Sequence, residues 1–187
     1  LALSNIGMAM QKQGDYKNAV KLLRESSDML KRIGYELGVG LTLVSLSSAL
    51  LDLGQREEST THYLEVLYLG RKIHSKPLIL AAIAGAASIY EAMGHLEEAL
   101  TLATIVQAHP ATDDEIRTKA ADVLQLVRTR NSTLSPAILA NRSLDETLDH
   151  LVQSLLASGV SPHILSAFSR SLSNTFTTAR EVAKVST

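Results

Sequence analysis

The pattern of apolar and polar positions over the first hundred residues has the spacing of α-helices. Apolar side chains fall at i, i+3 and i+7, as at Leu3, Ile6 and Met10, which places them on one face of a helix. Glycine follows such stretches at positions 14, 54 and 94, forty residues apart each time. Because glycine adopts positive φ without steric cost, it suits a tight turn after a helix. Each forty-residue unit is therefore predicted to hold two antiparallel helices joined at this glycine.

Small residues recur at the positions where the two helices of a unit are expected to cross. They are Gly7, Ser47 and Ala87 in the first helices and Ala19, Ser59 and Ala99 in the second. A small side chain at a crossing lets the two helix backbones approach closely.

This succession of apolar positions, small residues and a turn glycine resembles the tetratricopeptide repeat. The resemblance covers residues 1–107 or so. It departs from that family in two ways: aliphatic residues stand at 3, 43 and 83, where the family usually has tryptophan, and the period is forty residues instead of the usual 34. Repeats of about forty are seen in bacterial regulators of the MalT and AfsR kind. The resemblance implies an all-α fold, a right-handed α–α superhelix of three helix pairs (1–34, 35–74 and 75–109) with C-terminal capping helices.

Residues 110–130 are predicted to form one of these capping helices. Pro110 ends the preceding helix, and Thr112 with Glu115 has the pattern of a capping box at the start of the next one. Apolar residues then follow at helical spacing, so this helix is expected to cover the open end of the stack, as a solenoid requires.

Residues 131–187 are interpreted as a connector followed by C-terminal helices and a tail. Ser143 with Glu146 forms a second capping-box pattern ahead of an amphipathic stretch. This stretch, "NRSLDETLDHLV", together with "HPAT" at 109–112, resembles the end of large bacterial signal-transduction ATPases of the AfsR and LuxR-related type. In those proteins the repeats follow a nucleotide-binding domain and often a DNA-binding domain. The chain also begins in a helical rhythm without an initiator methionine, so we expect it to be a piece of a longer polypeptide.

Composition narrows the classes of partner. The net charge is −1, so no basic field favours direct binding of nucleic acid or of an anionic membrane surface. No stretch approaches the ~18 uncharged apolar residues of a membrane span. The chain has no cysteine, which excludes disulfides and thiolate metal sites and fits the reducing cytoplasm that we expect as its location.

No catalytic or cofactor motif emerges from the residues. The glycines of "GYELGVG" (34–40) lack the lysine of a phosphate-binding loop, and they are better explained by a turn and a helix start. The six histidines have no zinc-ligand spacing, and Asp113, Asp114 and Glu115 are better explained as partners of a helix dipole. We expect no enzyme, no cofactor and no metal, and an enzymatic site stays conceivable only within residues 131–187.

A partner-binding groove is implied by the resemblance, because the first helices of such repeats line one side of the stack. The carried-over groove positions are Ser4, Asn5, Met8, Gln11, Lys12, Val44, Ser45, Ser48, Leu51, Asp52, Ala84, Ser88 and Glu91, with Gly85 and Ala92 beside them. One known use of the fold clamps a chaperone carboxylate with lysine and asparagine. Asn5 matches that set, but Ser4 and Met8 replace a lysine and an asparagine. A small, partly apolar groove suits an amphipathic helix or an extended peptide, or other domains of the parent chain.

These observations predict a non-catalytic repeat module that binds a protein, a peptide or an inducer. Its expected context is the C-terminal sensor region of a larger bacterial transcriptional regulator or signalling ATPase. The alternative is a free-standing adaptor that scaffolds two proteins.

Overall fold

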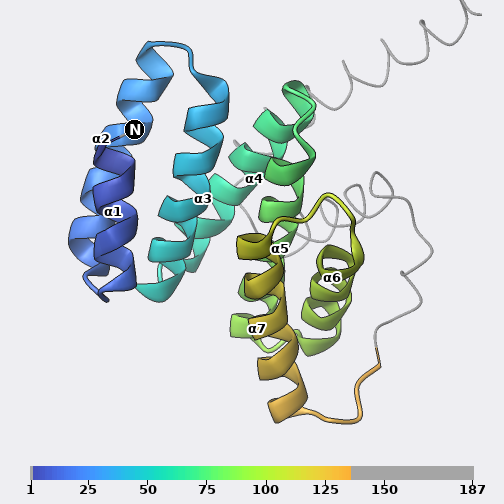
Figure 1. Cartoon of the computed structure of the whole chain (residues 1–187). Helices are drawn as coiled ribbons and strands as arrows, with labels where there is room; N and C mark the ends of the chain where they lie inside the picture. Colours follow the sequence, from blue (N-terminus) through green and yellow to red (C-terminus); the bar gives the residue numbers. More distant parts are fainter. Residues whose placement is uncertain (1, 136–187) are drawn as a thin grey trace, which may run out of the picture. The chain divides into compact units, whose positions relative to one another are not determined.

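The computed structural model describes residues 2–135, which lie within one compact unit and form seven α-helices. The helices are α1 (Ala2–Lys12), α2 (Tyr16–Arg32), α3 (Glu36–Asp52), α4 (Arg56–Lys72), α5 (Lys76–Met93), α6 (Leu96–Ala108) and α7 (Asp114–Arg130) (Figure 1). Consecutive helices pack against each other, and this part of the chain contains no strand. The predicted all-α repeat fold is confirmed. The capping box predicted at Ser143 and the tail after it lie outside the described residues.

Each of the five turns that connect α1 to α6 contains a residue with positive φ, and in four of these turns the residue is glycine. The sequence predicts three of the four, Gly14, Gly54 and Gly94. Their φ angles are 80°, 76° and 84°. The two turns between repeats have the same left-handed backbone conformation, at Gly34 (φ 70°) and at His74 (φ 54°). A left-handed residue therefore recurs every twenty positions from 14 to 94, and the chain reverses at each one.

The small residues lie where the helices of a repeat cross, as predicted. A Cβ atom added at Gly7 would stand 2.8 Å from Cγ of Leu23 on α2. In the second repeat both small residues are fully buried, and the Ser59 hydroxyl donates a hydrogen bond of 2.7 Å to the Ser47 carbonyl oxygen. A hydroxyl that bonds a backbone carbonyl fills this crossing without leaving a buried polar atom unpaired.

Close packing joins the second and third repeats, between α4 and α5. The ring of Tyr63 lies directly over Gly85, so that a Cβ atom added at Gly85 would stand 2.2 Å from the ring. Only 3% of Tyr63 is exposed. The predicted groove position Gly85 is therefore used for packing.

Helix α7 contacts both α6 and α5. The prediction of its N-cap at Thr112 was wrong by one residue, because the Asp113 carboxylate accepts the hydrogen bond from the Ile116 amide at 2.8 Å. The Thr112 hydroxyl instead donates to the carbonyl oxygen of Val106 at 2.7 Å and ties the loop to α6. Leu126 occupies the position that matches buried Leu46 and Ala86, yet it is 47% exposed, so α7 does not repeat the stacking of α3 and α5.

Helix α5 is long and apolar enough, by length and composition alone, to cross a membrane, although it contains two charged residues, Lys76 and Glu91. In the structure 72% of this helix is buried. Its fully buried residues include Leu80, Ile83 and Ala87, so α5 has the burial of a central core helix.

Candidate partner-binding face

The predicted groove positions divide into covered and open ones. Four of them are buried within the fold, namely Ser4, Ala84, Gly85 and Glu91, and Glu91 is also ion-paired. The others are partly or fully exposed: Asn5, Met8, Gln11, Lys12, Val44, Ser45, Ser48, Leu51, Asp52, Ser88 and Ala92. Most of the open positions belong to α1 and α3.

Ser4 is buried because it links three helices. Its hydroxyl lies 2.6 Å from the Ser26 hydroxyl on α2 and 3.0 Å from the Thr42 hydroxyl on α3. All three residues are at most 6% exposed. Three hydroxyls that satisfy one another are a structural contact between two repeats, and they leave Ser4 unavailable to a partner.

The inner face of the third repeat is covered as well, on the side where α7 packs. Ala84 is fully buried. Arg130 of α7 lies 2.9 Å from the Glu91 carboxylate and donates a hydrogen bond of 3.0 Å to the Glu91 carbonyl oxygen. Because Glu91 is only 8% exposed, it serves this contact with α7 and is not open to a ligand.

Lys119 of α7 reaches further, to the second repeat. Its ammonium group donates to the Tyr63 hydroxyl at 2.7 Å and to the Ser48 hydroxyl at 3.1 Å, and it lies 5.4 Å from the centre of the Tyr63 ring. Ser48, a predicted groove residue, is thus a contact of α7. Hydrogen bonds from a charged donor are stronger than neutral ones, so these two bonds tie α7 to the second repeat.

A stripe of apolar side chains remains open on α3. Leu37 is 39% exposed and Leu41 is 53% exposed, while Val44 and Leu51 are half-buried. These four residues lie on one side of the helix, because their spacing of four, three and seven follows its turns. The sequence interpretation assigned 34–40 to a turn and a helix start, and its groove positions in this repeat began at Val44. It therefore missed Leu37 and Leu41, although their spacing from Val44 places them on the same side of a helix.

Helix α1 borders this stripe. The side-chain amide of Gln11 donates a hydrogen bond of 3.2 Å to the Asp52 carboxylate and bridges the ends of α1 and α3. Half-buried Met8 and exposed Asn5 lie on the same helix. We call the surface formed by Asn5, Met8, Leu37, Leu41, Val44 and Leu51 the α1–α3 face.

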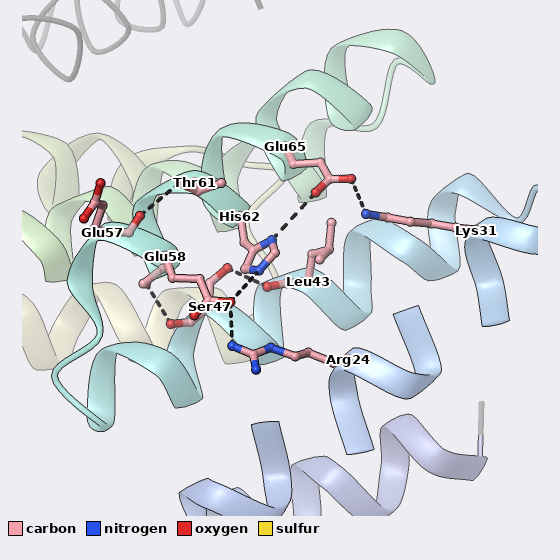
Figure 2. Close-up of polar contacts among 10 residues, drawn as sticks. Arg24, Lys31, Leu43, Ser47, Glu57, Glu58, Thr61, His62 and Glu65 are labelled. Carbon is pink, nitrogen blue, oxygen red and sulfur yellow. Dashed lines mark hydrogen bonds and ion pairs between the residues drawn. The ribbon is translucent and has the colours of Figure 1, made fainter. Parts of the chain in front are cut away.

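The second helices carry the charges instead. Arg24 and Lys31 of α2 pair with Glu58 and Glu65 of α4 at 2.5 Å and 2.7 Å (Figure 2). His62 stands between the two carboxylates, 3.7 Å from each, as Figure 2 shows. Burial opposes ionisation of Glu65, but hydrogen bonds and charge from His62 and Lys31 outweigh it, so the pKa of this carboxyl is lowered.

Other surfaces of the described chain offer less. A shallow hollow of about 580 Å³ between α6 and α7 has a mixed lining that includes Gln107, Leu124 and Arg128. Within residues 2–135, no group of three or more histidine, aspartate or glutamate side chains is arranged to hold a metal ion.

Comparison with known families agrees with the repeat. Residues 1–33 match the model of the tetratricopeptide repeat. The chain has no significant match among curated proteins or among solved structures. The matched segment and the all-helical structure together support a tetratricopeptide-repeat protein, a class that generally mediates protein–protein interactions and is typically non-catalytic.

Proposed function

We propose that this chain is a non-catalytic module that binds an amphipathic helix or an extended segment of a protein on its α1–α3 face. The observation that carries the proposal is the apolar stripe from Leu37 to Leu51, with Leu37 and Leu41 in solvent. An open apolar stripe on a rigid helix suits the helix-in-groove mode, in which apolar anchors at i, i+3 or i+4 and i+7 provide affinity.

The proposal extends to the context of the module. The forty-residue period and the resemblance of "HPAT" and "NRSLDETLDHLV" to bacterial signalling ATPases support a place in the C-terminal sensor region of a larger regulator. In that context the bound segment biases the active state of the parent, either from another protein or from another domain of the same chain.

The binding site is tested by selecting peptides of random sequence on the immobilised chain and measuring their affinity for two variants. Leu41→Glu places a charge in the stripe, whereas Met29→Glu places one at a 50% exposed apolar residue of α2, away from α3's stripe. Loss of a buried leucine contact and burial of a carboxylate should weaken binding at least about tenfold in Leu41→Glu. Met29→Glu should bind as the parent does.

Selected peptides that bind both variants equally well would rule out the α1–α3 face. Because both substitutions are at exposed positions, circular dichroism of the two variants should match that of the unmodified chain. The regulator context is tested separately by the intact mass of the native polypeptide that reacts with an antibody against this chain. A mass close to 20.2 kDa would rule that context out.

A further inference from the structure

A second apolar surface lies on α1, on a flank apart from the α1–α3 face. The matching flanks of the three first helices carry small or apolar residues at the same places, with threonine once. On α3 and α5 they are at most 3% exposed: Thr42, Leu46 and Ala49, and Ala82, Ala86 and Ile89. On α1 the corresponding residues, Ala2, Ile6 and Ala9, are exposed, and Ile6 is 48% exposed.

The buried flanks face the second helix of the repeat before them, and on α3 the Thr42 hydroxyl also contacts Ser4 of α1. Helix α2 packs on α3 and α4 packs on α5. A Cβ atom added at Gly38 would stand 3.3 Å from Cδ2 of Leu30, and one added at Gly70 would stand 3.1 Å from Cβ of Leu78. The contact is therefore made at matching positions, 30 with 38 and 70 with 78, at both junctions.

Helix α2, which pairs with α1 in the first repeat, does not cover this flank. Gly7 faces Leu23 of α2, and it stands about a hundred degrees around the helix from Ile6. The surface that Ile6 presents thus corresponds to the surface on which α2 and α4 sit in the next two repeats. An exposed isoleucine at a position that is otherwise buried indicates a missing neighbour rather than a solvated site.

The chemistry of the neighbour can be read from α2 and α4. The faces that they bury carry small or apolar residues at i, i+1 and i+4: Ser26, Ser27 and Leu30, and Val66, Leu67 and Gly70. A second copy of the described part does not offer such a face: α3 and α5 already pack on α2 and α4, and the matching positions of α6 are buried Val106, polar Gln107 and Pro110, which lies beyond the end of the helix.

We propose that the flank formed by Ala2, Ile6 and Ala9 is a docking surface for a helix of the α2 and α4 type, supplied by a further repeat ahead of α1 in the same polypeptide. The inference rests on the proposed function only in placing the chain within a longer repeat protein. It involves neither the α1–α3 face nor its ligand.

The test adds a copy of residues 15–40 directly ahead of Leu1 of the full chain. Residue 40 of the copy then precedes Leu1 as it precedes Leu41, so the forty-residue register is kept. The control carries the same copy with Ser27→Glu and Leu30→Asp, which changes only its docking face. The intact copy should raise Tm by about 4 °C or more over the control.

A second comparison uses Ile6→Asp. In the chain without the copy this substitution should leave Tm nearly unchanged, because Ile6 is exposed. In the chain with the copy it should remove most of the gain in Tm. Equal Tm for the intact and the altered copy would overturn the proposal, and binding of selected peptides to the α1–α3 face would still report on the proposed function independently.

Two further measurements address the cases in which the extended chain does not fold or the full chain forms a dimer. If the extended chain fails to fold, a synthetic peptide of residues 15–34 added to the full chain should slow hydrogen exchange in α1, but not in Ile6→Asp; no protection would overturn the proposal. Light scattering of the full chain should give a monomer. A dimer that Ile6→Asp dissociates would assign the flank to a second copy and overturn the proposal as well.

Discussion

The first and third repeats share one sequence pattern but differ in what covers them. In the first repeat Ile6 is 48% exposed and the inner side of α1 is open, with Asn5 in solvent. In the third, the matching Ala86 is 2% exposed, and the inner side is covered, with Arg130 of α7 on Glu91. The exposure of a repeat position is therefore set by the neighbours of the repeat and not by its pattern alone.

The largest expected effect on stability comes from disrupting the packing of α4 on α5 in the covered third repeat. Gly85→Ala forces a methyl group to within about 2 Å of the buried Tyr63 ring and should lower the free energy of unfolding by about 3 kcal/mol. Urea denaturation measures it. The double variant Gly85→Ala with Tyr63→Leu should recover part of the loss, since the smaller side chain makes room. A single variant as stable as the unmodified chain would contradict the packing described for α4 and α5.

A smaller effect on stability is expected when the contact between α7 and the second repeat is weakened. Lys119→Met removes the hydrogen bonds to Tyr63 and Ser48, and it should cost about 1 kcal/mol because Lys119 is partly exposed. Hydrogen exchange should become faster in α7 while α1 and α2 keep their protection. Lys21→Met, at an exposed position of α2, is the matched control. Unchanged exchange in α7 would mean that Lys119 does not hold this helix.

The smallest effect concerns the junction between the first two repeats, where charges pair across α2 and α4. Forty residues on, the matching positions are Leu64 with Glu98 and Arg71 with Ile105, so opposite charges do not recur there. The folded pKa of Glu65 lies below its ordinary value of 4.5, so its contribution to stability is present above that pH and is lost as the pH falls through the lower folded pKa.

Lys31→Met should raise the folded pKa of Glu65 toward its ordinary value and make stability less sensitive to acid. The change should be below about 1 kcal/mol, because both side chains are partly exposed and screened. Urea midpoints at pH 7 and pH 3 measure it, with Lys17→Met, at an exposed position of α2, as the control. An identical pH dependence in both variants would show that Lys31 does not act on Glu65.

The sequence predicts the features that follow from the local spacing of apolar, small and glycine residues. It does not predict the burial that depends on where α7 packs. Helical spacing, the turn glycines and the small residue at position 7 were sufficient to predict the helix pairs and their crossings. The burial of Ala84 and Glu91 was not predictable in this way, because Arg130 lies 39 residues from Glu91 and nothing local marks the pair.

Two further misses concern single positions of α1 and α3. Ser4 matched a groove position, but its short hydroxyl finds Ser26 and Thr42, which are 22 and 38 residues away. Leu37 and Leu41 were hidden by the glycines between them, which favour a turn by composition although the helix runs through Gly38 and Gly40. Those glycines are tolerated there because Tyr35 and Leu78 occupy the space of their missing side chains.

The left-handed residues at every twentieth position also limit how this chain can change in evolution. Each of them fixes where a helix stops, so the helix between two of them has a set length and a set rotation. Loss of one residue within α3 would turn the rest of that helix by roughly 100° and move part of its buried side toward solvent. Insertions and deletions should therefore survive only in the turns or as whole repeats, and relatives should differ in length by multiples of the repeat.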